Sequence, residues 1–290
     1  MPSDVIQWFP GHMAKTRRLI KENLSKVDVV LNVLDARIPQ SSRNPEITRL
    51  VAGKPMLNVL SKYTLADPDV SAKWKKYYGE SGENCVFIDS VTGYGIKDLL
   101  PKIRETVSDK IEKYEAKGMS GRAVRAMIVG IPNSGKSSLI NRLAGSKKAK
   151  VENRPGVTLT NQWVNTSIGL DLMDMPGVLW PKFDDRKTGE NLAITGAIKD
   201  QVVVVEDLAV ALVDRLRKVC PGKLGERYKL GESDLDASLE NWQVAENIGR
   251  KRGFLVAGGE VDFLRTANML LEEFRSGKIG RITLEAPPSK

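Results

Sequence analysis

The chain has 290 residues, of which 41% are hydrophobic, a size that suggests about two domains with ordinary buried cores. It contains no run of roughly 18 apolar residues, and Asp4 interrupts its first apolar stretch, so we expect a cytoplasmic protein with neither a membrane partner nor a signal peptide. The net charge is +9, and the surplus lies in residues 1–182, because residues 183–290 hold 17 Lys and Arg against 18 Asp and Glu. Such a surplus indicates a nucleic-acid partner, although charge that only faces water is the simpler alternative.

The first part of the chain alternates predicted strands and helices. An amphipathic helix follows Lys15, after a segment that contains His12, the only histidine of the protein. Apolar and β-branched runs predict strands over 27–35, 55–60 and 85–88. Helices are predicted over 46–51, 70–78 and 96–117, with a flexible joint at 118–121. This alternation favours a doubly wound α/β sheet.

A P-loop pattern, G-x-x-x-x-G-K-S over residues 130–137, follows the apolar run 126–129 and precedes a helical run. Its glycines let the backbone curl, so that N–H groups at a helix N-terminus face a polyphosphate. Lys136 would reach the β- and γ-phosphates, and the Ser137 hydroxyl would bind Mg²⁺. The alternative is a glycine-rich turn that binds nothing.

A second motif, which contains an acidic residue, lies about 40 residues beyond the P-loop. A polar loop over 153–158 and predicted strands over 159–164 and 170–173 lead to Asp174-Met175-Pro176-Gly177, a D-x-x-G sequence. Nucleotide hydrolysis with Mg²⁺ needs a carboxylate held near the metal through water and a mobile glycine N–H near the γ-phosphate. Asp174 and Gly177 are therefore candidates for these roles.

Long helical stretches follow residue 182 and predict an all-helical second domain over 183–290. The predicted helices span 189–197, 208–219, 239–250 and 261–276. Its one dense basic cluster is Arg250-Lys251-Arg252. Two interpretations stay open for this cluster: cations that stabilise a helix C-terminus, or a phosphate contact.

The order of these motifs resembles that of the circularly permuted GTPases of ribosome assembly, the YlqF/RbgA family. The stretches that carry the resemblance are 8–15, 35–37, 42–45, 130–137, 154–158 and 174–180. The resemblance implies a P-loop GTPase sheet with the motif order G4-G5-G1-G2-G3 over residues 1–182, then a smaller all-α domain that docks on rRNA. It also implies GTP hydrolysis in late assembly of the large ribosomal subunit, stimulated by the ribosome. We expect a monomer.

The resemblance also implies a role for each motif residue. Lys136 binds phosphates, Asp174 holds the water of the metal, and the Gly177 N–H senses the γ-phosphate. The loop that begins at Asp89 resembles the one whose backbone N–H contacts the guanine oxygen. The metal ligands implied are Ser137, Thr158 and Asp174. The residues implied to bind GTP or GDP are Ser61, Lys62, Thr64, Asp89, Ser90, Val91, Asn133, Ser134, Gly135, Lys136, Ser137, Ser138, Thr158 and Gly177.

Two further hypotheses concern catalysis and the dependence of turnover on K⁺. Val178 stands where many GTPases have a glutamine that orients the attacking water, and a valine side chain forms no hydrogen bond. The resemblance implies that His12 supplies this function beside Lys136, whereas a helix-entry or packing histidine is the alternative. Asn133 resembles the asparagine that helps related GTPases coordinate K⁺, and equal turnover in Na⁺ and K⁺ would contradict that role.

The chain departs from the family in its guanine-reading motif. The family pattern is N-K-x-D, whose aspartate accepts two hydrogen bonds from guanine, whereas this chain has Ser61-Lys62-Tyr63-Thr64. Loss of a bidentate base contact predicts a guanine preference weakened by roughly ten- to a hundredfold. Two alternatives therefore stay open: a relaxed-specificity nucleoside triphosphatase, and a nucleotide-gated RNA-binding scaffold with little turnover.

Overall fold

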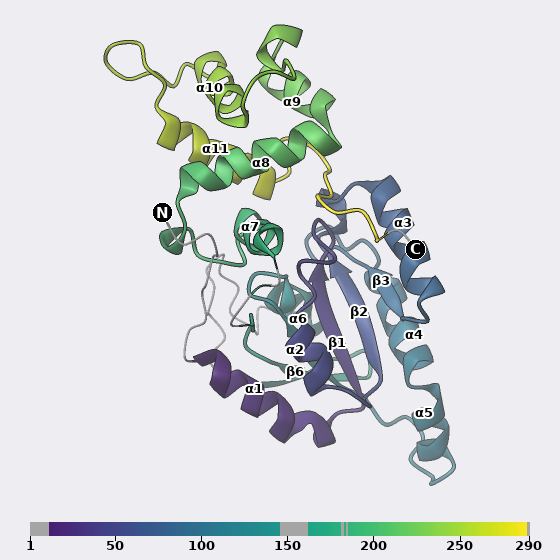
Figure 1. The fold of residues 1–290 in the computed structure, drawn as a ribbon. Helices are drawn as coiled ribbons and strands as arrows, with labels where there is room; N and C mark the ends of the chain where they lie inside the picture. The colour runs from purple at the N-terminus through teal and green to yellow at the C-terminus, as the bar shows by residue number, and fades with distance from the viewer. Residues whose placement is uncertain (1–11, 146–161, 181–182, 184, 289–290) are drawn as a thin grey trace. The chain divides into compact units, whose positions relative to one another are not determined.

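The computed structural model describes residues 12–145, 162–180, 183 and 185–288 (Figure 1). These residues form two compact units. The sheet unit contains the described residues up to 180 together with the chain from residue 285 onward, and the helical unit contains residues 183–284. The assignment of nucleotide binding to residues 1–182 and of rRNA binding to residues 183–290 stays a prediction.

The sheet unit is built on six strands in the order β3-β2-β1-β4-β6-β5. The strands are β1 (Val29–Asp35), β2 (Met56–Ser61), β3 (Cys85–Phe87), β4 (Val124–Gly130), β5 (Gln162–Asn165) and β6 (Leu170–Asp174). Neighbours pair in parallel, except that β5 runs antiparallel to β6. All seven residues of β1 are buried, which confirms a central strand covered on both faces.

Helices cover this sheet, and in the view of Figure 1 α3, α4 and α5 lie to the right of β2. The helices of the sheet unit are α1 (His12–Asn23), α2 (Pro45–Leu50), α3 (Pro68–Glu80), α4 (Ile96–Thr106), α5 (Ser108–Glu115) and α6 (Lys136–Ala144). α2 and α3 begin in the same way, with a proline at the first helical position. Asn44 caps α2 and Asp67 caps α3 through side-chain oxygens that accept backbone N–H groups.

The single helix predicted over 96–117 is wrong, because the chain breaks at Val107 into α4 and α5. The Thr106 hydroxyl donates to the Lys102 carbonyl oxygen (2.8 Å), a bond that bends helices. Val107 itself is buried in the core of the sheet unit. The break between the two helices therefore falls at a residue that packs in the core.

The helical unit contains α7 (Arg186–Ile194), α8 (Val205–Val219), α9 (Pro221–Tyr228), α10 (Asn241–Lys251) and α11 (Phe263–Arg275). Helix α9 was not predicted, because its glycines weaken the helical pattern although Pro221 stands at its first position. In the basic cluster, Lys251 pairs with Asp234 (3.1 Å), and Arg252 lies over the Tyr228 ring. These two cations thus have contacts inside the unit, whereas Arg250 is exposed.

The carboxyl ends of the parallel strands meet at one edge of the sheet. In the sheet, β2 and β3 lie on one side of β1, whereas β4, β6 and β5 lie on its other side. Open α/β sheets bind ligands at the carboxyl ends of strands where the strand order reverses in this way. The P-loop follows β4 and therefore lies at this point. None of the helices in the described part of the chain is long and apolar enough to cross a membrane.

Candidate functional site

The P-loop connects β4 to α6 and depends on backbone conformations that favour glycine. Gly130 has a φ of +149°, and a Cβ there would lie 2.4 Å from the Val33 carbonyl oxygen. Gly135 has a φ of +98° immediately before α6, and Asn133 is left-handed at +55°. Glycine is thus needed at Gly130 both for its φ and for the close approach of β1.

Lys136 is buried at the start of α6. Its Nζ donates to the carbonyl oxygens of Ile131 (2.8 Å) and Gly130 (3.3 Å). Burial lowers the pKa of Lys136 to about 8, while the attraction of Asp174 acts in the opposite direction. A phosphate beside this amine would stabilise its charged form.

The rest of the loop also fits a polyphosphate. The first turn of α6 has no acidic side chain of its own that would repel an anion at the helix N-terminus. The Ser134 hydroxyl is buried without a hydrogen-bond partner among the described residues. Ser137 and Ser138 follow on the helix, half-buried. These residues fit a Mg²⁺-bound nucleotide, with Ser137 as the hydroxyl ligand.

Ser61 at the end of β2 and the next residue, Lys62, contact the P-loop. The Ser61 hydroxyl lies between two carbonyl oxygens, those of Leu34 (2.8 Å) and Ser134, and shares its one proton between them. Lys62 is left-handed, with a φ of +58°, and its Nζ donates to the Asn133 carbonyl oxygen (2.6 Å). The structure therefore brings the predicted base-reading segment and the P-loop into direct contact.

A buried carboxylate at the end of β1 completes this connection. Asp35 accepts from Lys62 Nζ (2.9 Å) and from the Arg37 guanidinium (2.8 and 3.0 Å). Burial alone would raise the pKa of Asp35, but the charges of Arg37 and Lys62 hold it well below its usual range. Asp35 and Arg37 belong to a stretch that carries the family resemblance, but no role was predicted for them. The available signal was an acid at the end of a buried strand, two residues before an arginine.

A hydrogen bond between Thr64 and Asp89 joins the loop after β2 to the loop after β3. The Thr64 hydroxyl donates to Asp89 Oδ2, and Asp89 Oδ1 accepts the N–H groups of Val91 (2.8 Å) and Thr92 (3.0 Å). Burial raises the pKa of Asp89, but these hydrogen bonds more than offset it and the pKa is lowered. The Val91 N–H is therefore bound within its own loop, the loop in which a backbone N–H is predicted to contact the guanine oxygen. The neighbouring Ser90 hydroxyl is buried without a partner among the described residues.

The D-x-x-G segment lies directly against the P-loop. Asp174 ends β6, is buried and pairs in register with Ile128 of β4. The Val178 N–H donates to the Gly130 carbonyl oxygen (3.1 Å), and the Val178 side chain is 1% exposed. A Cβ at Gly177 would lie 2.8 Å from Pro132 Cα, so only glycine fits between these segments. The structure thus places Asp174 and Gly177 beside the phosphate loop.

Three of the predicted roles stay predictions. Thr158 and the His12 side chain lie outside the described residues. A role of Asn133 in K⁺ binding also stays a prediction.

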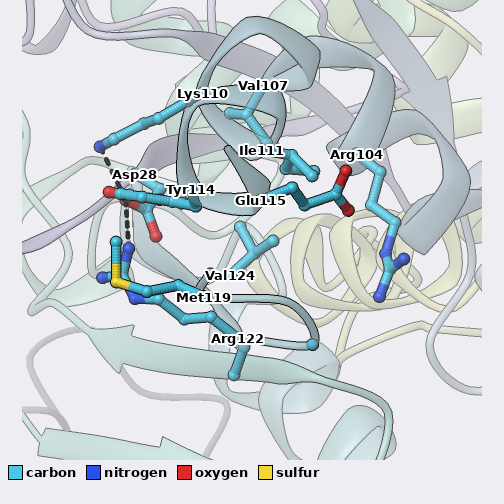
Figure 2. Close-up of a pocket in the computed structure, with 12 residues that line it drawn as sticks. Asp28, Arg104, Val107, Lys110, Ile111, Tyr114, Glu115, Met119, Arg122 and Val124 are labelled. Carbon is cyan, nitrogen blue, oxygen red and sulfur yellow. Dashed lines mark hydrogen bonds and ion pairs between the residues drawn. The ribbon is translucent and has the colours of Figure 1, made fainter. Parts of the chain in front are cut away.

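A shallow hollow lies away from the site, where β1 and β4 begin (Figure 2). One of its acidic residues, Asp28, accepts from Lys110 Nζ (2.6 Å) and from the Tyr114 hydroxyl (2.9 Å). Asp28 is thus already paired within the protein, and the hollow lies at the opposite ends of β1 and β4 from the P-loop.

The geometry defines a P-loop GTPase domain. The loops after β2 and β3, which are predicted to contact the guanine base, precede its P-loop in the chain. A family model described as 50S ribosome-binding GTPase matches residues 125–247, beginning in the P-loop strand. Ribosome biogenesis GTPase A of Bacillus cereus is 44% identical over 98% of this chain and 94% of that protein, and that of Priestia megaterium is 46% identical over 97% of each. The chain belongs to this family of ribosome biogenesis GTPases, the YlqF/RbgA family.

More distant relatives and solved structures agree with this assignment. Mitochondrial ribosome-associated GTPase 1 of Mus musculus is 35% identical over 97% of this chain and 90% of that protein. The GDP-bound structure of TM YlqF is 25% identical, with a TM-score of 0.66 over 93% of this chain and 99% of that one. GNP-bound YlqF from T. maritima, at 24% identity and a TM-score of 0.65 over 95% of this chain and all of that one, shows the same fold. The fold is thus a circularly permuted P-loop GTPase sheet followed by a smaller helical unit.

Proposed function

We propose that this protein hydrolyses GTP to GDP and phosphate and acts in assembly of the large ribosomal subunit. The observation that carries the proposal is the meeting of three segments at one sheet edge: the P-loop with buried Lys136, the D-x-x-G segment, and the loop held by Lys62. The names of the full-length relatives, ribosome biogenesis GTPase A and mitochondrial ribosome-associated GTPase 1, support the process.

The chemistry is phosphoryl transfer to water. A bound Mg²⁺ would neutralise charge on the β- and γ-phosphates. Lys136 would add a fixed positive charge, and the amide groups of residues 131–136 would surround the phosphates. Ser137, Asp174 and Thr158 would hold the metal, Asp174 through water. The Gly177 N–H would contact the γ-phosphate and couple its presence to the D-x-x-G segment.

Slow turnover without a partner follows from Val178. Its side chain is buried and its N–H is bound to Gly130, so Val178 does not orient the attacking water. Another group must do so, and His12 is the only histidine of the chain. We expect His12→Ala to lose most of the hydrolysis that ribosomes stimulate while GTP affinity is kept. Full stimulated turnover in His12→Ala would contradict this role.

The partner proposed is the large ribosomal subunit and its rRNA, bound by a monomer in the cytoplasm. The net charge of +9 supports contact with a polyanion. Binding to rRNA phosphates predicts an affinity that falls steeply with salt. Co-sedimentation with purified large subunits, at several salt concentrations and with GTP or GDP, measures this directly.

The test of function is GTP turnover with and without large subunits, with small subunits as the matched control. We expect stimulation by large subunits alone, and loss of turnover in Lys136→Ala. Nucleotide binding without stimulated turnover would favour the RNA-binding scaffold instead. Failure to bind any nucleotide would refute the GTPase proposal.

A further inference from the structure

We propose that Thr64 and Asp89 together read the guanine base, with Asp89 fixing the Thr64 hydroxyl as a hydrogen-bond acceptor for the guanine N1–H. This inference rests on the proposed function, because it concerns the base of the nucleotide whose phosphates the P-loop would bind. It gives the chain a base-reading group in place of the aspartate that position 64 lacks. Asp89 acts through Thr64 and is therefore a positioning residue.

The position of the pair on the sheet suits the base of a nucleotide. Neighbouring strands lie about 4.8 Å apart, so the ends of β2 and β3 lie roughly 10 and 14 Å along the sheet edge from the end of β4. The loop after β2 is joined to the P-loop through Ser61 and Lys62. The pair therefore lies along the edge beside the P-loop, where the base of a nucleotide with its phosphates on the P-loop would reach it.

The two loops that carry the pair are also joined to each other. The Tyr63 and Tyr94 rings stack with centroids 4.3 Å apart and an interplanar angle of 22°. Tyr63 comes immediately before Thr64, and Tyr94 lies in the loop that Asp89 begins. The Asp89 N–H donates to the Tyr94 carbonyl oxygen (2.9 Å). These contacts hold Thr64 and Asp89 in a fixed relation.

The direction of the Thr64–Asp89 hydrogen bond sets what the hydroxyl offers to a ligand. A threonine hydroxyl has one proton and two lone pairs, whereas an ionised carboxylate only accepts. Because the proton of Thr64 is given to Asp89 Oδ2, its oxygen presents lone pairs alone to a third group. The negative charge behind it strengthens that acceptor. Thr64 is only partly buried, so a ligand can reach the hydroxyl.

An acceptor of this kind distinguishes the two purines. The guanine edge carries an N1–H and a 2-amino group, both donors. Adenine has a bare N1 lone pair at the same place, which would face the lone pairs of Thr64. A site built to accept a hydrogen bond rejects an analogue that lacks the donor, because its polar group is then left unpaired. The sequence predicts a weakened preference for guanine. Asp89, 25 positions after Thr64, thus restores part of that preference.

Asp89 also has a purely structural role that the test must separate from base reading. Its Oδ1 accepts two backbone N–H groups and holds the turn at residues 89–92. Asn at this position can still accept both with its amide oxygen. Its amide nitrogen would then donate to Thr64, which turns the hydroxyl proton toward the base. Asp89→Asn therefore keeps the turn and reverses the polarity of Thr64.

The experiment measures displacement of fluorescent GDP from the full-length protein by GDP, IDP and ADP, a binding assay that needs no turnover. For the unaltered protein we expect IDP, which keeps N1–H but lacks the 2-amino group, to bind nearer to GDP than to ADP. Asp89→Asn and Thr64→Val should each lower the preference for GDP over ADP by about tenfold or more. Thr64→Ser, which keeps the hydroxyl, should retain the preference.

Two further variants complete the test. Asp67→Asn removes the same charge from the cap of α3, three residues from Thr64, and should leave the preference unchanged. The double variant Thr64→Asp, Asp89→Asn moves the carboxylate to position 64. It should restore the preference for GDP over ADP that Asp89→Asn alone lowers. An unchanged GDP-to-ADP ratio in either Asp89→Asn or Thr64→Val would overturn the inference, as would equal affinity of the unaltered protein for both. Absence of all nucleotide binding would instead refute the proposed function.

Discussion

At the scale of single residues, Lys136 shows how the loop prepares a charge for a ligand. Its amine lies inside the P-loop, bound to two carbonyl oxygens of that loop, and burial lowers its pKa to about 8. An ammonium in such a place has lost the hydration that stabilises it in water. The phosphates of a nucleotide would replace that hydration, so binding of the nucleotide and protonation of Lys136 are linked.

This linkage predicts how GDP affinity depends on pH. Below pH 8 the amine is already protonated and affinity should change little. Above pH 8 binding must take up a proton, so affinity should fall, by at most about tenfold per pH unit. Calorimetry at pH 8.5 in two buffers of different ionisation enthalpy measures the proton uptake. The uptake should disappear in Lys136→Arg, whose guanidinium keeps its proton.

A second prediction concerns Gly177. In Gly177→Ala the new methyl group would lie 2.8 Å from the backbone of Pro132, so the D-x-x-G segment and the P-loop must separate. We expect the free energy of unfolding to fall by about 1–3 kcal/mol, with weaker GTP binding. Gly79→Ala is the control: it has open space in α3 and should gain about 0.5–1 kcal/mol. Similar effects of the two changes in denaturant titrations would contradict the close contact.

At the scale of elements, the ends of β1, β2 and β4 act as one assembly. Asp35 ends β1, Lys62 follows β2, and the lysine reaches both this carboxylate and the P-loop after β4. The parallel register sets these contacts, because Asp35 lies opposite Ser61 in the ladder. Three neighbouring loops are therefore positioned by one buried carboxylate and the cations around it.

Asp35→Asn tests this assembly. The change would leave the positive charges of Arg37 and Lys62 without the carboxylate between them, and removal of one partner from a buried ion pair costs about 3–5 kcal/mol. Because the pKa of Asp35 is depressed, its contribution is present above the ordinary value of 3.8 and is lost as the pH falls through and below it. Acid titration of stability should therefore be less steep in Asp35→Asn than in the unaltered protein.

The elements also show what the sequence could reveal. β1 and the P-loop were predictable, because a continuous apolar run and glycine spacing are local signals. The break at Val107 and helix α9 were missed, since packing of buried residues outweighs local propensity there. The Thr64–Asp89 pair was beyond sequence reasoning for another reason. Its partners lie 25 residues apart, and only the alignment of β2 with β3 brings them together.

At the scale of the whole chain, the C-terminal segment returns to the sheet unit after the helical unit ends at residue 284. The Glu285 carboxylate accepts the N–H groups of Gln40 (2.8 Å) and Ser41 (3.0 Å), and its carbonyl oxygen accepts from Trp74 Nε1 (2.8 Å). Glu285 is only 8% exposed. The sequence offered no signal for this contact, because it joins residues about 245 positions apart.

This return predicts that Glu285 holds the loop between β1 and α2. Glu285→Gln replaces the carboxylate, whose Oε2 accepts the N–H groups of both Gln40 and Ser41, by a neutral amide oxygen, so both hydrogen bonds lose the strength that the negative charge gives them. Hydrogen exchange of these amides should accelerate, while exchange in β4 stays unchanged. Glu260→Gln, on an exposed side chain, is the matched control. Equal exchange of Gln40 and Ser41 in both variants would show that the loop holds its conformation without the C-terminal segment.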